Sequence, residues 1–158
     1  MREDAHKKLM TEAEEAHKQE IERKVLAVVF ERNPFPIPPA MIDAWAAERV
    51  RSLVAMMRNQ GISEQRAWQF AQQNFESMKA AAAYQVRRHL TLEAIGRQER
   101  IEISDEALSA EVVERIERHG EQAGKVFERP DARAALQEEL IEKQALATLL
   151  AAAHVVAA

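Results

Sequence analysis

The sequence predicts an all-α, elongated protein, and three observations support this fold class. Apolar residues recur at spacings of three and four over most of the chain, which is the period of an amphipathic helix. No segment alternates convincingly between apolar and polar residues as a strand would. Alanine, the best helix former, supplies much of the 47% hydrophobic content but buries little area per residue. We therefore expect long, slender helices rather than a compact globule.

The first helix is expected over residues 2–31. Its apolar residues form a stripe that broadens toward the C-terminal end: Leu9, Met10, Ala13, Ala16, Ile21, Val25, Leu26, Val28 and Val29. About thirty helical residues span roughly 45 Å, which is longer than a compact domain of this size needs. The polar first half of this helix is therefore expected to face a partner segment or solvent.

A proline-rich elbow separates the first helix from the second. Four of the five prolines lie within residues 34–39, with Phe35 and Ile37 between them. Proline lacks an N–H and disfavours helix in the residue before it, so this stretch is expected to be extended. Pro39 suits the first turn of the next helix, which is predicted to run to Asn59 and to stop at Gly61.

Three further helices and a short turn are predicted after Gly61. Ser63 is a candidate N-cap for one continuous helix over residues 64–98, in which Gly96 is a candidate end or bend. The stripe of that helix comprises Trp68, Ala71, Phe75, Met78, Ala82, Val86 and Leu90. Residues 101–104 are expected to be an extended link. Ser104-Asp105-Glu106 is expected to start a helix that closes at His119-Gly120. A weak helical turn over 122–128 and a last helix over 131–153 complete the chain.

Charge and composition exclude several classes of function. Charged residues make up 30% of the chain, the net charge is −4, and the two signs are interleaved, which argues against a nucleic-acid binder. No run of 18 apolar residues exists, and the first residues lack the apolar core of a signal peptide. Cysteine is absent, which removes disulfides and thiol catalysis and fits a reducing compartment. The expected location is the cytoplasm.

No constellation in the sequence indicates catalysis, a bound metal or a cofactor. Glu3-x-x-His6 and Glu14-x-x-His17 have the spacing found in di-iron bundles, but both lie on one helix among lysines and glutamates. We interpret them as a solvated charged face. The other histidines (His89, His119 and His154) stand alone, the serines lack a nucleophile-elbow context, and no Gly-rich phosphate loop exists.

Methionines and aromatic residues are concentrated in the second and third predicted helices: Met41, Met56, Met57, Met78, Trp45, Trp68, Phe70 and Phe75. Most of them are expected to form the seam of an antiparallel hairpin. Phe70 falls off the main stripe, so its ring is expected to face outward. A thin hairpin cannot bury all these side chains, and exposed apolar patches mark interaction sites. Unbranched thioethers also adapt to varied apolar partners.

The whole pattern resembles the C-terminal chaperone domain of bacterial trigger factor. The segments that carry this resemblance are "LAVVFERNPFPIPPAMIDAWAAERV", "RQERIEISDEAL" and "LIEKQALATLLAAAHV". The resemblance implies a backbone helix (1–32), a first arm (33–100), and a second arm with a closing helix (101–158). It also implies projecting helical-hairpin arms that form a cradle. The elbow then lets the first arm leave the backbone helix at an angle, with Phe35 and Ile37 packed at the junction.

The implied function is ATP-independent holding of unfolded or nascent polypeptides. The candidate client contacts are Phe35, Ile37, Met41, Met56, Met57 and Phe70, and each has burial in the core as its rival role. The family's ribosome-docking and FKBP-type prolyl-isomerase domains would precede this chain and are missing from it. The chain is therefore expected not to be an enzyme, and to meet the ribosome only through a missing domain. It is either an excised fragment or a stand-alone relative. Formation of a weak homodimer is a further possibility.

Three alternatives are weighed against this reading. The first is the helical module of SurA-type periplasmic chaperones. The missing signal peptide and the highly charged arms argue against it. The second is a structural or dimerisation module whose apolar stripes are consumed by self-association. The third is a di-metal bundle enzyme, which predicts bound iron or manganese.

Overall fold

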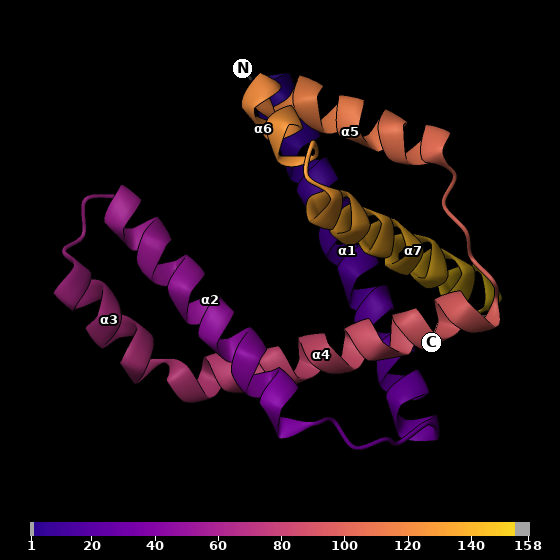
Figure 1. Ribbon diagram of the computed structural model, residues 1–158, viewed down its shortest axis with the longest axis horizontal. Helices are drawn as coiled ribbons and strands as arrows, with labels where there is room; N and C mark the ends of the chain where they lie inside the picture. Colours follow the sequence, from indigo (N-terminus) through magenta and orange to yellow (C-terminus); the bar gives the residue numbers. More distant parts are fainter. Residues whose placement is uncertain (1, 154–158) are drawn as a thin grey trace. The chain divides into compact units, whose positions relative to one another are not determined.

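The computed structural model describes the backbone of residues 2–153 and the side chains of residues 10–121 and 124–153. Within this part of the chain the helices are α1 (Arg2–Arg32), α2 (Pro39–Asn59), α3 (Glu64–Gln73), α4 (Phe75–Gln98), α5 (Asp105–His119), α6 (Glu121–Val126) and α7 (Pro130–Ala152) (Figure 1). No strand occurs among the described residues, which confirms the predicted all-α class. In the same range, every helix is too short or too polar to cross a bilayer.

The helices form two compact units. Unit 1 contains the residues up to Pro34 together with those from Leu92 onward, and unit 2 is the continuous segment Phe35–Thr91. Each unit has its own hydrophobic core, so each is described by itself. The first part of α4 belongs to unit 2 and its last part to unit 1.

The core of unit 1 joins three helices that lie far apart in the sequence. Leu26 of α1, Leu92 of α4 and Leu146 of α7 are buried together, along with Ala145. Phe30, Ile95, Ile101, Leu149 and Leu150 pack around them. Farther toward the N-terminus, the side chains of residues 10–20 are all exposed, as expected for the polar half of the first helix.

The core of unit 2 lies between α2 and α3. Val50 and Val54 of α2 pack against Ala67 and Ala71 of α3, and these two alanines are fully buried. Leu53, Met57 and Met78 pack around this cluster. Because both core residues of α3 are alanines, the backbones of the two helices can approach closely.

The turns that end α2 and α4 have the same hydrogen-bond pattern. After α2, Ile62 N donates to Met57 O and Gly61 N donates to Arg58 O, with Gly61 at φ +83°. This is a Schellman motif, and it confirms the predicted role of Gly61. After α4, Ile101 N donates to Gly96 O and Arg100 N donates to Arg97 O.

The helix-ending residue of α4 is Arg100, at φ +52°, and not Gly96 as the sequence indicated. Gly96 is buried within the last turns of α4, beside α7. A Cβ at this position would lie 2.6 Å from Ile141 Cγ2, so glycine serves close helix packing here.

The continuous helix predicted over residues 64–98 is wrong, because it is broken at Asn74 into α3 and α4. The Asn74 side-chain amide donates to Phe70 O at 2.8 Å, and the Asn74 backbone N donates to the same oxygen at 3.2 Å. Asparagine side chains compete with the helix for backbone partners in this way. The predicted stripe is also wrong at Trp68 and Phe75, which are exposed. Its member Ala71 is buried as predicted, together with Ala67, which the stripe did not include.

The start of α5 confirms the predicted cap. Ser104 is the N-cap, and its hydroxyl oxygen accepts a hydrogen bond from Ala107 N at 3.2 Å. The pKa of Glu106 is lowered by its own backbone N–H and by the Ser104 hydroxyl. Ser63 is the N-cap of α3 as predicted, but its side chain makes no capping hydrogen bond.

One arginine links α5 to α7 in unit 1. The Arg115 guanidinium donates to Glu111 of its own helix at 3.0 Å and to Glu139 of α7 at 2.5 Å. It also lies over the ring of Phe127, 5.6 Å from the centroid. Partial burial opposes the charge, but the hydrogen bonds with Glu139 and Glu111 raise the pKa of Arg115.

Candidate functional site

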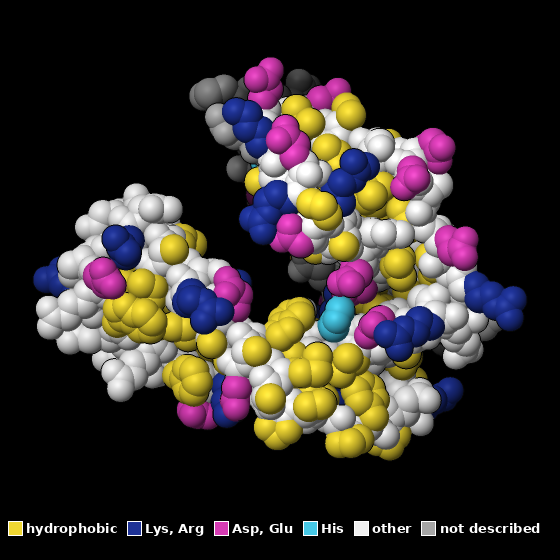
Figure 2. All heavy atoms as spheres, viewed as in Figure 1, with side chains coloured by type: hydrophobic (Ala, Val, Ile, Leu, Met, Phe, Trp, Pro, Cys, Tyr) yellow, Lys and Arg dark blue, Asp and Glu magenta, His cyan; other side chains and the backbone are white. Residues whose placement is uncertain are grey.

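Unit 2 leaves large apolar side chains in contact with solvent. Trp45, Met56, Trp68, Phe70 and Phe75 are each between 37% and 50% exposed. Figure 2 shows apolar side chains at the surface over α2 and α3, bordered by charged side chains of both signs. We call these five residues the apolar surface of unit 2.

The helical geometry of α3 explains this exposure. Ala67 and Ala71 are four residues apart and lie on the face that packs against α2. At 100° per residue, Trp68 and Phe70 fall on opposite sides of that buried face. Neither ring can enter the seam, and both stay near its borders, 47% and 46% exposed.

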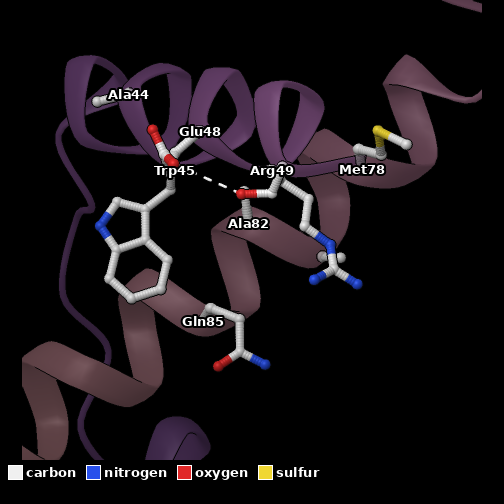
Figure 3. Close-up of a pocket in the computed structure, with 9 residues that line it drawn as sticks. Ala44, Trp45, Glu48, Arg49, Met78, Ala82 and Gln85 are labelled. Carbon is white, nitrogen blue, oxygen red and sulfur yellow. Dashed lines mark hydrogen bonds between the residues drawn. The ribbon is translucent and has the colours of Figure 1, made fainter. Parts of the chain in front are cut away.

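A groove of about 630 Å³ lies between α2 and α4, within unit 2. Its lining residues are Ala44, Trp45, Glu48, Arg49 and Ser52 of α2, with Met78, Ala81, Ala82 and Gln85 of α4. In Figure 3 the Trp45 indole and the Arg49 guanidinium extend from α2 on either side of Ala82 of α4, and the Gln85 side chain extends from α4; all four residues line the groove. Trp45, Arg49, Ser52 and Met56 follow each other at helical spacing, so this flank of α2 continues from the groove to the exposed Met56.

The acidic groups in and near the groove have partners. Arg51 donates to Glu48 through both Nε and Nη2. The Ser52 hydroxyl donates to the other oxygen of Glu48 at 3.5 Å, which is the dashed line in Figure 3. Asp43 forms an ion pair with Lys79 at 2.8 Å, and the hydrogen bond with Asp43 raises the pKa of Lys79.

Ring contacts position two aromatic residues of unit 2. The Trp45 ring lies 5.9 Å from His89 of α4, measured between centroids and tilted by 40°. Phe35, in the elbow, lies under the Arg87 guanidinium, 5.8 Å from the ring centroid. The first contact connects α4 to α2, and the second connects α4 to the elbow before α2.

The six candidate contacts predicted from the sequence are all in unit 2 but differ in exposure. Met56 and Phe70 are 50% and 46% exposed, and the outward ring of Phe70 agrees with its position off the stripe. The other four are half-buried: Phe35, Ile37, Met41 and Met57, of which Met57 packs against the core. Sequence reasoning missed Trp45, Trp68 and Phe75 because their spacing matched a buried stripe.

The side chains that the structure describes include no group of three or more His, Asp or Glu residues that could hold a metal ion. Glu14 and His17 are exposed on α1. The side chains of Glu3 and His6, and the whole of His154, lie outside the described part of the chain. Within that part, the candidate site is therefore an apolar surface with a groove.

The fold and this surface define a class: an all-α domain that presents apolar side chains and an open groove. The family model described as "Bacterial trigger factor protein (TF) C-terminus" matches residues 1–151. The chain therefore belongs to the bacterial trigger factor C-terminal family, as its resemblance indicated.

Curated relatives give the same result. The chain is 33% identical to the trigger factor of Anaeromyxobacter sp. (strain Fw109-5) over 98% of this chain and 36% of the relative. It is 34% identical to the trigger factor of Bacillus mycoides (strain KBAB4) and that of Bacillus thuringiensis (strain Al Hakam), over 88% of this chain and 35% of each relative. The chain thus spans about a third of the length of these relatives. No solved structure matches it significantly.

Proposed function

We propose that this chain is the client-holding part of an ATP-independent chaperone, which binds unfolded or nascent polypeptides through exposed apolar side chains. Membership of the trigger factor family supports the chaperone class. The observation that carries the mechanism is the arrangement of unit 2, in which alanines fill the seam of α3 and large apolar residues stay at the surface.

The energy of holding comes from burying client side chains. One large apolar side chain gains about 1.5–3 kcal/mol when it is fully buried, and less on a surface that stays half open. Several separated patches acting on one client raise the total affinity without any single strong contact. This mode of binding tolerates many client sequences, as methionine and aromatic surfaces do.

The six candidate client contacts are part of this proposal, with Met56 and Phe70 as its most exposed members. We add Trp45, Trp68 and Phe75 to them. The division into a backbone helix (1–32), a first arm (33–100) and a second arm with a closing helix (101–158) also belongs to the proposal. Unit 2 lies within the proposed first arm. A cytoplasmic location, the absence of catalysis by this chain, and ribosome contact through another domain complete it.

The test is suppression of aggregation. A protein unfolded in guanidinium chloride is diluted into buffer with and without the chain, and light scattering is followed. We expect the chain to reduce scattering, and Met56→Glu and Phe70→Glu to weaken that effect while their thermal unfolding by circular dichroism stays nearly unchanged. Gln69→Glu, at an exposed position beside Phe70, is the control for the added charge.

Two results would contradict the proposal. If the unmodified chain does not lower scattering, it is a structural or dimerisation module and not a holdase. If both variants hold the client as well as the unmodified chain, the apolar surface of unit 2 is not where clients bind.

A further inference from the structure

The two units differ strongly in charge. Unit 2 holds seven Lys and Arg against four Asp and Glu, a net charge of +3. The whole chain holds 22 against 26, so the remainder holds 15 against 22, a net charge of −7. The apolar surface of unit 2 is therefore set on a basic background within an acidic chain.

In and near the groove, the acidic side chains have partners within the protein and one basic side chain does not have one among the described residues. The carboxylate of Glu48 is occupied by Arg51 and Ser52, and nearby Asp43 is occupied by Lys79. Arg49 also lines the groove, is exposed, and forms no ion pair, hydrogen bond or ring contact with any described residue. A guanidinium has five N–H donors and no acceptor.

The shape of the groove fits apolar side chains beside this cation. Ala44, Ala81 and Ala82 are short, so they leave room in a groove whose larger apolar lining residues are Trp45 and Met78. The volume of about 630 Å³ lies within the usual range for ligand pockets, about 300–1,000 Å³. An apolar segment placed there would lie next to Arg49, whose guanidinium shares the groove with the Trp45 ring (Figure 3).

We infer that the α2–α4 groove binds polypeptide segments in which apolar side chains are accompanied by an aspartate or glutamate, with Arg49 receiving the carboxylate. This inference rests on the proposed function and adds a charge preference to it. Charge complementarity carries it: an apolar segment with a lysine would set a cation against Arg49, while the acidic groups near it are already paired.

The experiment uses three fluorescein-labelled peptides with blocked C-termini, identical except for one central Glu, Gln or Lys among leucines and phenylalanines. Fluorescence anisotropy with the full chain gives each Kd. We expect the Glu peptide to bind about three- to fivefold tighter than the Gln peptide, the effect of one exposed charge pair, and the Lys peptide to bind most weakly. Salt at 0.5 M should reduce these differences.

Two variants that each remove one positive charge test whether the preference for the Glu peptide comes from Arg49. Arg49→Gln should make the Glu and Gln peptides bind equally. Arg66→Gln removes the same charge from exposed α3 outside the groove, and should keep the preference. Trp45→Ala should weaken the Glu and Gln peptides alike and leave their ratio unchanged, because it removes apolar contact only.

The inference is overturned if the Glu and Gln peptides bind equally to the unmodified chain. It is also overturned if the preference survives Arg49→Gln, or disappears equally in Arg66→Gln. Self-association in sedimentation velocity that Arg49→Gln abolishes would show that a second copy occupies the groove, which also overturns it. Failure of the proposed function looks different, because then no peptide binds and aggregation is not suppressed.

Discussion

Gly96 of α4 and Ile141 of α7 lie so close that a single added carbon would collide, since a Cβ on Gly96 would lie 2.6 Å from Ile141 Cγ2. The colliding atom is attached at the branched Cβ of isoleucine, so it cannot swing away as the end of a flexible chain could. This contact lies in unit 1, where α4 and α7 also share the core around Leu92 and Leu146.

Gly96→Ala should therefore destabilise the protein. Alanine gains about 1 kcal/mol in helix propensity over glycine, but overpacking costs about 1–3 kcal/mol. We expect a net loss of up to about 2 kcal/mol in the free energy of unfolding, measured in urea. Combining it with Ile141→Ala should cost less than the sum of the two changes, because the colliding methyl group is gone. Strict additivity would contradict the close approach.

In unit 2, changing a small buried residue between α2 and α3 should destabilise the protein more than removing a large exposed one. Ala71→Leu enlarges a side chain that is 1% exposed, so we expect a loss of about 1–3 kcal/mol in the free energy of unfolding. Trp68→Ala removes a large ring that is 47% exposed and should cost less. Thermal and urea unfolding of both variants checks this order, and a reversed order would place Trp68 in the core.

Arg115 should contribute more than Arg118, the other arginine of α5, because it bridges to α7 from a side chain only 24% exposed. Arg115→Met should lower the free energy of unfolding by about 1–2 kcal/mol. Arg118→Met is the matched control, since its pairing with Glu114 stays within one exposed turn and is worth at most about 0.5 kcal/mol. Similar losses in the two variants would show that the bridge to Glu139 adds nothing.

Arg100→Gly should stabilise the end of α4. Arg100 occupies the left-handed position of the Schellman motif at φ +52°, where a side chain costs about 1 kcal/mol and glycine costs none. Part of this gain is offset by the greater freedom of glycine in the unfolded chain. We expect an increase of about 0.5 kcal/mol in the free energy of unfolding. A decrease would mean that the Arg100 side chain makes a contact that outweighs the strain.

The first turn of α5 should give stability that depends on pH. The pKa of Glu106 is lowered from 4.5, so its ionised form favours the folded state. This contribution is present above pH 4.5, the unfolded value, and is lost as pH falls through the lower folded value. Glu106→Gln should therefore lower Tm at pH 7 and have little effect near pH 3. A difference in Tm that is constant with pH would contradict this role.

Local signals in the sequence predicted the helix boundaries that depend on single residues. Proline and glycine fix the elbow, the start of α2 at Pro39 and its end before Gly61, because their backbone restrictions act within one or two residues. Ser104 predicted the start of α5 for the same reason. The trigger factor resemblance supplied the family, which no single element could.

Other features depend on packing, which periodicity does not report. A spacing of three and four persists across Asn74, so nothing in the pattern indicated the break between α3 and α4. Ala67, and not Trp68, is buried between α2 and α3 because the two helices approach closely there. The sequence pattern does not show how closely two helices approach. The groove, and the absence of a partner for Arg49 among the described residues, could be recognised only from the positions of α2 and α4 together.

The core that unites Leu26, Leu92 and Leu146 has a consequence for the order in which the chain folds. Unit 2 is one uninterrupted segment, so all its contacts are available once Thr91 has left the ribosome. The core of unit 1 joins α1 to α7, so α1 must wait until α7 has been synthesised. During translation, α1 thus stays without these neighbours after the whole of unit 2 has been made.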